Sequence, residues 1–103
     1  MGIQLVNVTR GRRQRVPIVR RKNQIKFFIT VSNLSAQEST AHIHAEDNLG
    51  NIWLHKDVPI PASSHTTVET LTGEATKSFV LKVSVKDIQG NVSDTKTMKV
   101  YVI

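Results

Sequence analysis

Hydrophobic and polar residues alternate with a period of two along most of this 103-residue chain, and helical periodicity is nearly absent. Four runs show the alternation clearly, with an apolar side chain at every second position, and four further runs show it more weakly. The clear runs are 25–32, 40–46, 79–86 and 97–103, and the weaker runs are 3–8, 16–21, 52–55 and 66–71. We therefore predict an all-β chain in which the four clear runs form the central strands.

Two short segments, 47–51 and 87–91, share the pattern Asp-x-x-Gly-Asn, which predicts hairpin turns between neighbouring strands. In each turn the aspartate can accept hydrogen bonds, and the glycine can adopt the positive φ that such turns require. A calcium loop is the weaker interpretation, because the alternating carboxylates and the final glutamate of such loops are missing. Between the turns, the proline-containing segment 58–61 is expected to be an extended connector, followed by a polar crossing at 62–64.

Seven to eight short strands separated by regular turns predict a β-sandwich or a barrel. The segments 27–33, 47–51, 59–64 and 83–91 resemble the immunoglobulin-like and fibronectin-III-like domains of bacterial surface proteins and tailed-phage structural proteins. The resemblance covers roughly residues 25–103 and implies an immunoglobulin-like sandwich of seven to eight antiparallel strands. The resemblance indicates architecture rather than function, because this fold serves many unrelated roles. The chain also departs from antibody-type domains, because it lacks their cysteine pair.

The net charge of +6 is distributed very unevenly along the chain. Residues 1–37 contain eight basic residues and no acidic residue, whereas the rest of the chain contains six lysines and eight acidic residues. All six arginines lie between positions 10 and 21. We expect residues 1–24 to form a basic N-terminal segment, folded as an edge hairpin of the same domain, and residues 25–103 to form the sandwich.

Clustered cations repel one another unless an anionic partner compensates their charge. Arginine in particular favours planar, bidentate contacts with phosphate or carboxylate groups. We therefore interpret the basic segment as a binding site for an anionic partner, although a solvated hairpin loop with Gly11 at its turn explains the pattern equally well. The candidate binding residues are Arg10, Arg12, Arg13, Arg15, Arg20, Arg21 and Lys22. The loop around 9–15 has no aromatic residue that could stack on a nucleic-acid base.

Histidines and outward-facing aromatic residues provide the remaining candidate sites. His42 and His44 point the same way from one predicted strand, and His55 lies near its hairpin partner. Such histidines can share a metal ion, but a polar strand face is the better explanation, and we expect neither a metal nor a cofactor. Phe28 and Tyr101 lie on otherwise polar faces, where they either cover a loop or anchor an interface with another protein.

Several classes of protein are disfavoured by residues that the chain lacks. Because cysteine is absent, disulfides, thiolate metal sites and a cysteine nucleophile are excluded. The usual hydrolase, phosphate-binding and zinc-protease motifs are also missing, so we expect no enzymatic activity. No apolar run approaches the roughly 18 residues of a membrane span. In the first residues a weakly apolar stretch precedes the positive charges, which is the reverse of a secretory signal.

The leading hypothesis is a non-catalytic structural module, specifically an accessory or decoration protein of a phage-like virion. Its basic segment would dock on an acidic surface formed by other protein subunits, on a virion or at a cell exterior. One alternative is a nucleic-acid-binding protein that uses the arginine-rich hairpin, and another is a bacterial surface adhesion domain. Self-association into a homo-oligomer is also compatible with the sequence.

Overall fold

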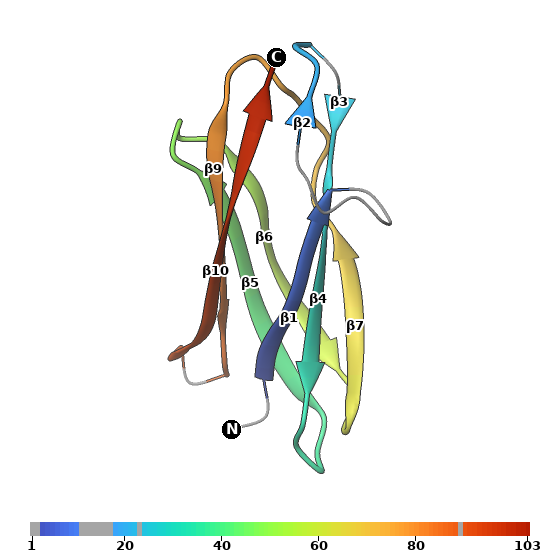
Figure 1. Cartoon of the computed structure of the whole chain (residues 1–103). Helices are drawn as coiled ribbons and strands as arrows, with labels where there is room; N and C mark the ends of the chain where they lie inside the picture. The colour runs from blue at the N-terminus through green and yellow to red at the C-terminus, as the bar shows by residue number, and fades with distance from the viewer. Residues whose placement is uncertain (1–2, 11–17, 23, 89) are drawn as a thin grey trace.

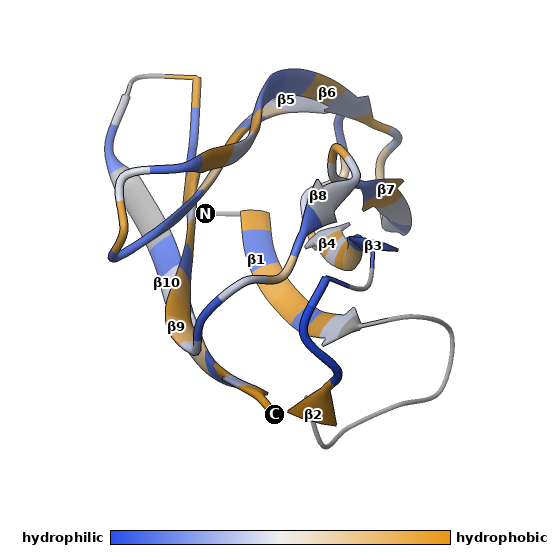
Figure 2. Ribbon diagram, turned by 90° about the horizontal axis from the view of Figure 1, so that it is seen from above, coloured by the Kyte–Doolittle hydropathy of each residue, from blue (hydrophilic) through white to orange (hydrophobic). Residues whose placement is uncertain are grey.

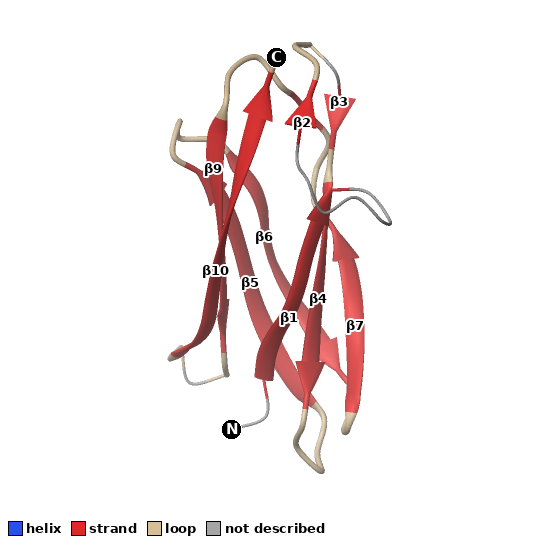
Figure 3. Ribbon diagram, viewed as in Figure 1, coloured by secondary structure: helices blue, strands red, loops and turns tan. Residues whose placement is uncertain are grey.

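The computed structural model describes residues 3–10, 18–22, 24–88 and 90–103, which form β-strands joined by turns and loops (Figures 1 and 3). No helix occurs within these ranges. The strands are β1 (Ile3–Arg10), β2 (Ile18–Val19), β3 (Gln24–Ile25), β4 (Phe27–Asn33), β5 (Ser39–Asp47), β6 (Ile52–Ile60), β7 (Ser64–Glu69), β8 (Gly73–Glu74), β9 (Phe79–Lys86) and β10 (Val92–Val102).

Two sheets face each other and form the body of the domain. One sheet has the strand order β1-β4-β7, and the other has the order β2-β10-β9-β5-β6; the short strands β3 and β8 form a separate pair. Viewed along the strands, the five-stranded sheet curves around the three-stranded sheet (Figure 2). Every pairing among the seven strands of six or more residues is antiparallel. The predicted immunoglobulin-like β-sandwich is therefore confirmed.

The strength of the alternation in the sequence corresponds to the position of each strand in its sheet. The four clear runs became β4, β5, β9 and β10, and each of these strands has a neighbour on both sides. The four weaker runs became β1, β2, β6 and β7, all of which lie at sheet edges. An edge strand is only partly covered, so fewer of its positions have to be apolar. The prediction of which strands are central is confirmed.

The core is closed by three aromatic rings from three different strands. Trp53 of β6 stacks on Phe79 of β9 with ring centroids 5.6 Å apart. Phe27 of β4 meets both rings edge-on, at 5.2 Å from Trp53 and 6.3 Å from Phe79. Such edge-to-face pairs are favourable beyond the burial of apolar area, by about 0.5–1.5 kcal/mol each. Trp53 itself is buried in the core.

Both Asp-x-x-Gly-Asn segments are hairpin turns, as predicted. In the turn between β5 and β6, Asn51 donates its backbone N–H to Asp47 Oδ1 at 3.0 Å, and Gly50 has a φ of +92°. In the turn between β9 and β10 the same bond joins Asn91 to Asp87 at 3.0 Å. Each aspartate thus fixes its own turn, which sets the register of the strands that follow.

Residues 58–60 continue strand β6, so the prediction of a connector over 58–61 is wrong for them. Pro59 lies opposite Thr40, and Ile60 lies opposite Ser39, on β5. The physical reason is that β6 is an edge strand, where the missing proline N–H leaves no neighbouring strand unpaired. The polar crossing that follows contains Ser63 with a φ of +54°.

The described part of residues 1–24 does not form the edge hairpin that we expected. Strand β1 pairs with β4, whereas β2 pairs with β10 in the opposite sheet. The two strands that flank residues 11–17 therefore belong to different sheets, and each lies at an edge. The pairing of β2 with β10 is also parallel, in contrast to the antiparallel order expected throughout.

Candidate functional site

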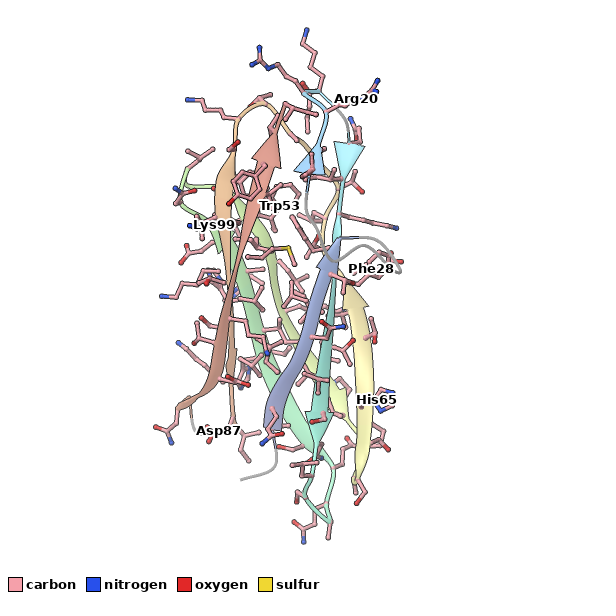
Figure 4. The ribbon with its side chains drawn as sticks, in the orientation of Figure 1. Arg20, Phe28, Trp53, His65, Asp87 and Lys99 are labelled. Carbon is pink, nitrogen blue, oxygen red and sulfur yellow. The ribbon has the colours of Figure 1, made fainter. Side chains whose placement is uncertain are left out.

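Three of the seven cations predicted to bind an anion lie together in a described turn. Arg20, Arg21 and Lys22 follow β2 and are all exposed, and Arg20 marks this end of the sandwich in Figure 4. We call these three residues the basic turn. Arg10 ends β1, but its side chain lies outside the described residues, as do Arg12, Arg13 and Arg15.

Backbone hydrogen bonds hold the basic turn against the C-terminal strand. Arg21 donates its N–H to the carbonyl of Ile103 at 2.9 Å, and Ile103 donates its own N–H to the carbonyl of Val19 at 2.9 Å. On the other side, Lys22 donates to the carbonyl of Ala75 at 2.6 Å. Lys22 also has a φ of +69°, a left-handed conformation that is uncommon for a residue with a side chain. The turn is thus fixed from both sides.

The charges of the basic turn are not balanced within the described part of the chain. The ion pairs found there join Lys26 to Glu69, His42 to Asp57 and His44 to Glu46, so none involves Arg20, Arg21 or Lys22. Three adjacent cations without a counter-charge repel one another and attract anions. Their guanidinium and ammonium groups are exposed and can contact an external partner.

Exposed apolar side chains lie directly beside the basic turn. Strand β2 places Ile18 opposite Tyr101 of β10, and these side chains are 50% and 51% exposed. Ile103, which bonds to the basic turn, is 71% exposed. The same end of β10 carries Lys99 beside Tyr101 in a shallow depression of about 160 Å³. Cations and apolar groups together therefore form one surface, which we call the basic-end surface.

The structure brings Tyr101 to the basic turn, whereas Phe28 lies on the other sheet, opposite Thr9 of β1. Phe28 lies on the outer face of the three-stranded sheet and is half-buried (Figure 4). The Lys26 ammonium lies 5.4 Å from the centre of its ring and also pairs with Glu69 at 3.1 Å. A role of Phe28 at an interface stays a prediction. Sequence reasoning missed Ile18 and Ile103, because only the pairing of β2 with β10 places them next to Tyr101.

The histidines of β5 and β6 form two separate contacts on the outer face of the five-stranded sheet. His44 Nδ1 lies 3.1 Å from His55 Nδ1. His42 instead contacts Asp57, with Nδ1 and Oδ1 2.5 Å apart. Among the described residues, no three possible metal ligands are close enough together to hold an ion. His44 and His55 are therefore in contact with each other, whereas His42 contacts Asp57 instead.

Comparison with solved structures identifies similar folds and no family. The CARDB domain of the PF1109 protein from Pyrococcus furiosus, solved in complex with di-metal ions, matches with a TM-score of 0.74 and 15% sequence identity. The match covers 99% of this chain and 90% of that domain. No protein-family model matches the sequence, and comparison with curated proteins finds no relative. The likeness to the CARDB domain supports the immunoglobulin-like fold.

Two β-glucosidases contain a region of similar fold. The enzyme from Erythrobacter marinus matches with a TM-score of 0.63 and 5% identity, and the enzyme from Listeria innocua with 0.54 and 12%. This chain spans 15% of the length of each enzyme, so the matches concern one domain of a much larger protein.

Within the described residues, no helix is long and apolar enough to cross a membrane.

Proposed function

We propose that this chain is a non-catalytic binding module whose basic-end surface docks on an acidic protein surface of a larger assembly. The observation that carries the proposal is the basic turn, in which Arg20, Arg21 and Lys22 are exposed and have no counter-charge among the described residues. Their backbone is already held by bonds to Ile103 and Ala75. A site that is ordered before binding loses less conformational entropy when the partner arrives.

The residues around the turn favour a protein over a nucleic acid as the partner. Protein interfaces combine aromatic and aliphatic groups with arginine, as Ile18, Tyr101 and Arg21 do here. Non-specific nucleic-acid sites instead use several aromatic side chains on which successive bases stack. Within the described part of this surface, Tyr101 is the one exposed aromatic residue. Carboxylates of a protein partner would pair with the cations, and apolar side chains of the same partner would pack on the apolar groups beside them.

In its most specific form, the proposal is an accessory or decoration protein on the exterior of a phage-like particle. Membership of a bacterial surface adhesion system is the alternative that uses the same surface. The likeness to a CARDB domain supports a binding or adhesion-type module and favours neither setting over the other. The matches to single domains of β-glucosidases agree with a sandwich that can serve as one domain of a larger protein.

A co-sedimentation assay with matched charge variants tests the proposal. The test variant replaces Arg20, Arg21 and Lys22 with glutamine, and the control variant replaces three exposed lysines from other surfaces, Lys56, Lys82 and Lys96. Both variants have the same net charge. We expect binding to particles or cell envelopes from the source to fall at least about tenfold for the test variant alone, and to weaken in high salt.

Duplex DNA in the same assay distinguishes the nucleic-acid alternative. Retention on DNA, with none on particles or envelopes, would show that the partner is a nucleic acid and that the proposal is wrong. Equal losses for both charge variants would also contradict it, because binding would then follow the net charge rather than the basic turn. Circular dichroism of each variant confirms that the fold is intact.

A further inference from the structure

The outer face of the five-stranded sheet carries a pair of histidines, remote from the basic turn, that the proposed function does not use. His44 on β5 and His55 on β6 lie directly opposite each other in the strand register. Their Nδ1 atoms are 3.1 Å apart, and the ring planes cross at 79° with centroids 5.3 Å apart. Two ring nitrogens thus face each other at the surface.

We propose that His44 and His55 chelate one late first-row divalent metal ion through their Nδ1 atoms. Imidazole nitrogen binds zinc at about 2.0–2.1 Å and also suits copper and nickel. With bonds of that length, an Nδ1–Nδ1 distance of 3.1 Å corresponds to a nitrogen–metal–nitrogen angle of about 98°. This angle lies between the ideal values for square-planar and tetrahedral coordination. Chelation requires each ring to tilt so that both Nδ1 lone pairs point at the metal ion.

Glu46 is placed to orient one of the two ligands. Its carboxylate Oε2 lies 3.5 Å from His44 Nε2, the ring nitrogen that points away from His55. A carboxylate at this position favours a hydrogen on Nε2, and the Nδ1 lone pair is then available to a metal ion. Carboxylates beside the second nitrogen of a ligating histidine are a recurring feature of metal sites. The arrangement of Glu46 therefore supports Nδ1 as the metal-binding atom.

Water has room to complete the coordination. A depression of about 350 Å³ borders the pair and is lined by Ser84 and Lys86 of β9 together with His42 and Asp57. His42 is occupied by its contact with Asp57, so the described residues supply two ligands, and the remaining positions are open to solvent or to a small ligand. The positive charge of Lys86 opposes a cation nearby, which places the site among weak, exchangeable sites rather than structural ones.

Titration of the full, tag-free chain with Cu²⁺, Ni²⁺ or Zn²⁺ alone tests the proposal. We expect one Cu²⁺ ion per chain, bound more tightly than Ni²⁺ or Zn²⁺ as the Irving–Williams order requires, with two nitrogen ligands in the electron paramagnetic resonance spectrum. Affinity should fall as the pH is lowered, because protons compete for the same nitrogens.

Single substitutions assign the ion to the pair. His44→Ala and His55→Ala should each weaken Cu²⁺ binding at least about tenfold, and Glu46→Gln should weaken it by about tenfold through the orientation of His44. The matched control is His65→Ala, which removes an exposed histidine from the opposite sheet (Figure 4). Absence of binding by the parent chain, or equal affinity in the His44→Ala, His55→Ala and His65→Ala variants, would overturn the proposal. Circular dichroism establishes that each variant is folded.

Discussion

Asp47 makes the buried polar contacts on which the β5–β6 hairpin depends, and replacing it with asparagine tests this interpretation. One carboxylate oxygen accepts the backbone N–H groups of Leu49 at 2.8 Å and Asn51 at 3.0 Å. The other accepts Nδ2 of Asn51 and Nε1 of Trp53, each at 3.0 Å. Burial of Asp47 opposes its ionisation, but the bonds from Asn51, Trp53 and Leu49 outweigh it and lower its pKa below the ordinary value.

The cost of Asp47→Asn follows from these four bonds. An asparagine can keep its oxygen towards Leu49 and Asn51, but its amide group then faces the indole N–H of Trp53, donor against donor. Trp53 is only 6% exposed, so water cannot replace the lost acceptor. An unsatisfied buried donor costs about 1–3 kcal/mol, and loss of the charge weakens the two remaining bonds by up to about 1 kcal/mol each. We expect a loss of about 3 kcal/mol in the free energy of unfolding, or about 10–20 °C in Tm.

Urea denaturation of the parent chain, Asp47→Asn and the matched variant Asp87→Asn measures this loss. Asp87 accepts the equivalent bond from Asn91 in the second turn but is less buried, so its replacement should cost about 1 kcal/mol or less. A cost below 1 kcal/mol for Asp47→Asn, or equal costs for the two variants, would refute the reasoning.

The same experiment has a pH dependence of defined sign. Because folding lowers the pKa of Asp47, its ionised form stabilises the fold above the ordinary pKa near 3.8, and this contribution disappears as the pH falls through the lower folded value. Asp47→Asn has no such contribution to lose. The difference in stability between the parent chain and the variant should therefore shrink as the pH falls below the ordinary pKa of about 3.8. A difference that stays constant as the pH falls would contradict the role of the charge.

Three further substitutions have expected outcomes. Gly73→Ala places a Cβ atom 2.6 Å from Cη2 of Trp53, so we expect calorimetry to show a loss of about 1–3 kcal/mol, and an unchanged Tm would contradict the packing described. Lys26→Gln breaks an exposed ion pair with Glu69, and urea denaturation should show a change of at most about 1 kcal/mol that vanishes in high salt. Tyr101→Ala should weaken binding to the partner about tenfold in the co-sedimentation assay while leaving Tm nearly unchanged, because the side chain is 51% exposed.

The alternation of hydrophobic and polar residues was sufficient to predict the sandwich, because it reflects which side chains of each strand are buried. A central strand of a sandwich buries one face in the core along its whole length, which leaves a strict alternating pattern, as in β9, where the predicted and observed bounds agree at Phe79–Lys86. The pattern is weaker for edge strands, and Pro59 was misinterpreted because its effect depends on whether β6 has a second neighbour. That neighbour relation is a property of the whole fold and not of the local sequence.

The candidate sites were less predictable, because they depend on contacts between distant segments. The pairing of β2 with β10 involves two residues on β2, Ile18 and Val19, which is too short for any periodic signal. The contact of His44 with His55 depends on strand register, and the β5–β6 pairing contains an irregularity between Ala45 and Glu46 that a sequence pattern does not reveal. Sequence reasoning therefore named candidate residues and left their neighbours in space open.

Site-specific crosslinking tests most directly whether the basic-end surface is the docking surface. Because the chain has no cysteine, Thr76→Cys beside the basic turn and Ala36→Cys in the β4–β5 loop each carry a single attachment point for a photo-crosslinker. The β4–β5 loop and the segment that leads into β9 lie at opposite ends of the sandwich (Figure 1). We expect crosslinks to the partner subunit from position 76 alone, and their loss in high salt. Crosslinks from position 36 alone, or equally from both, would contradict the proposed mode of docking.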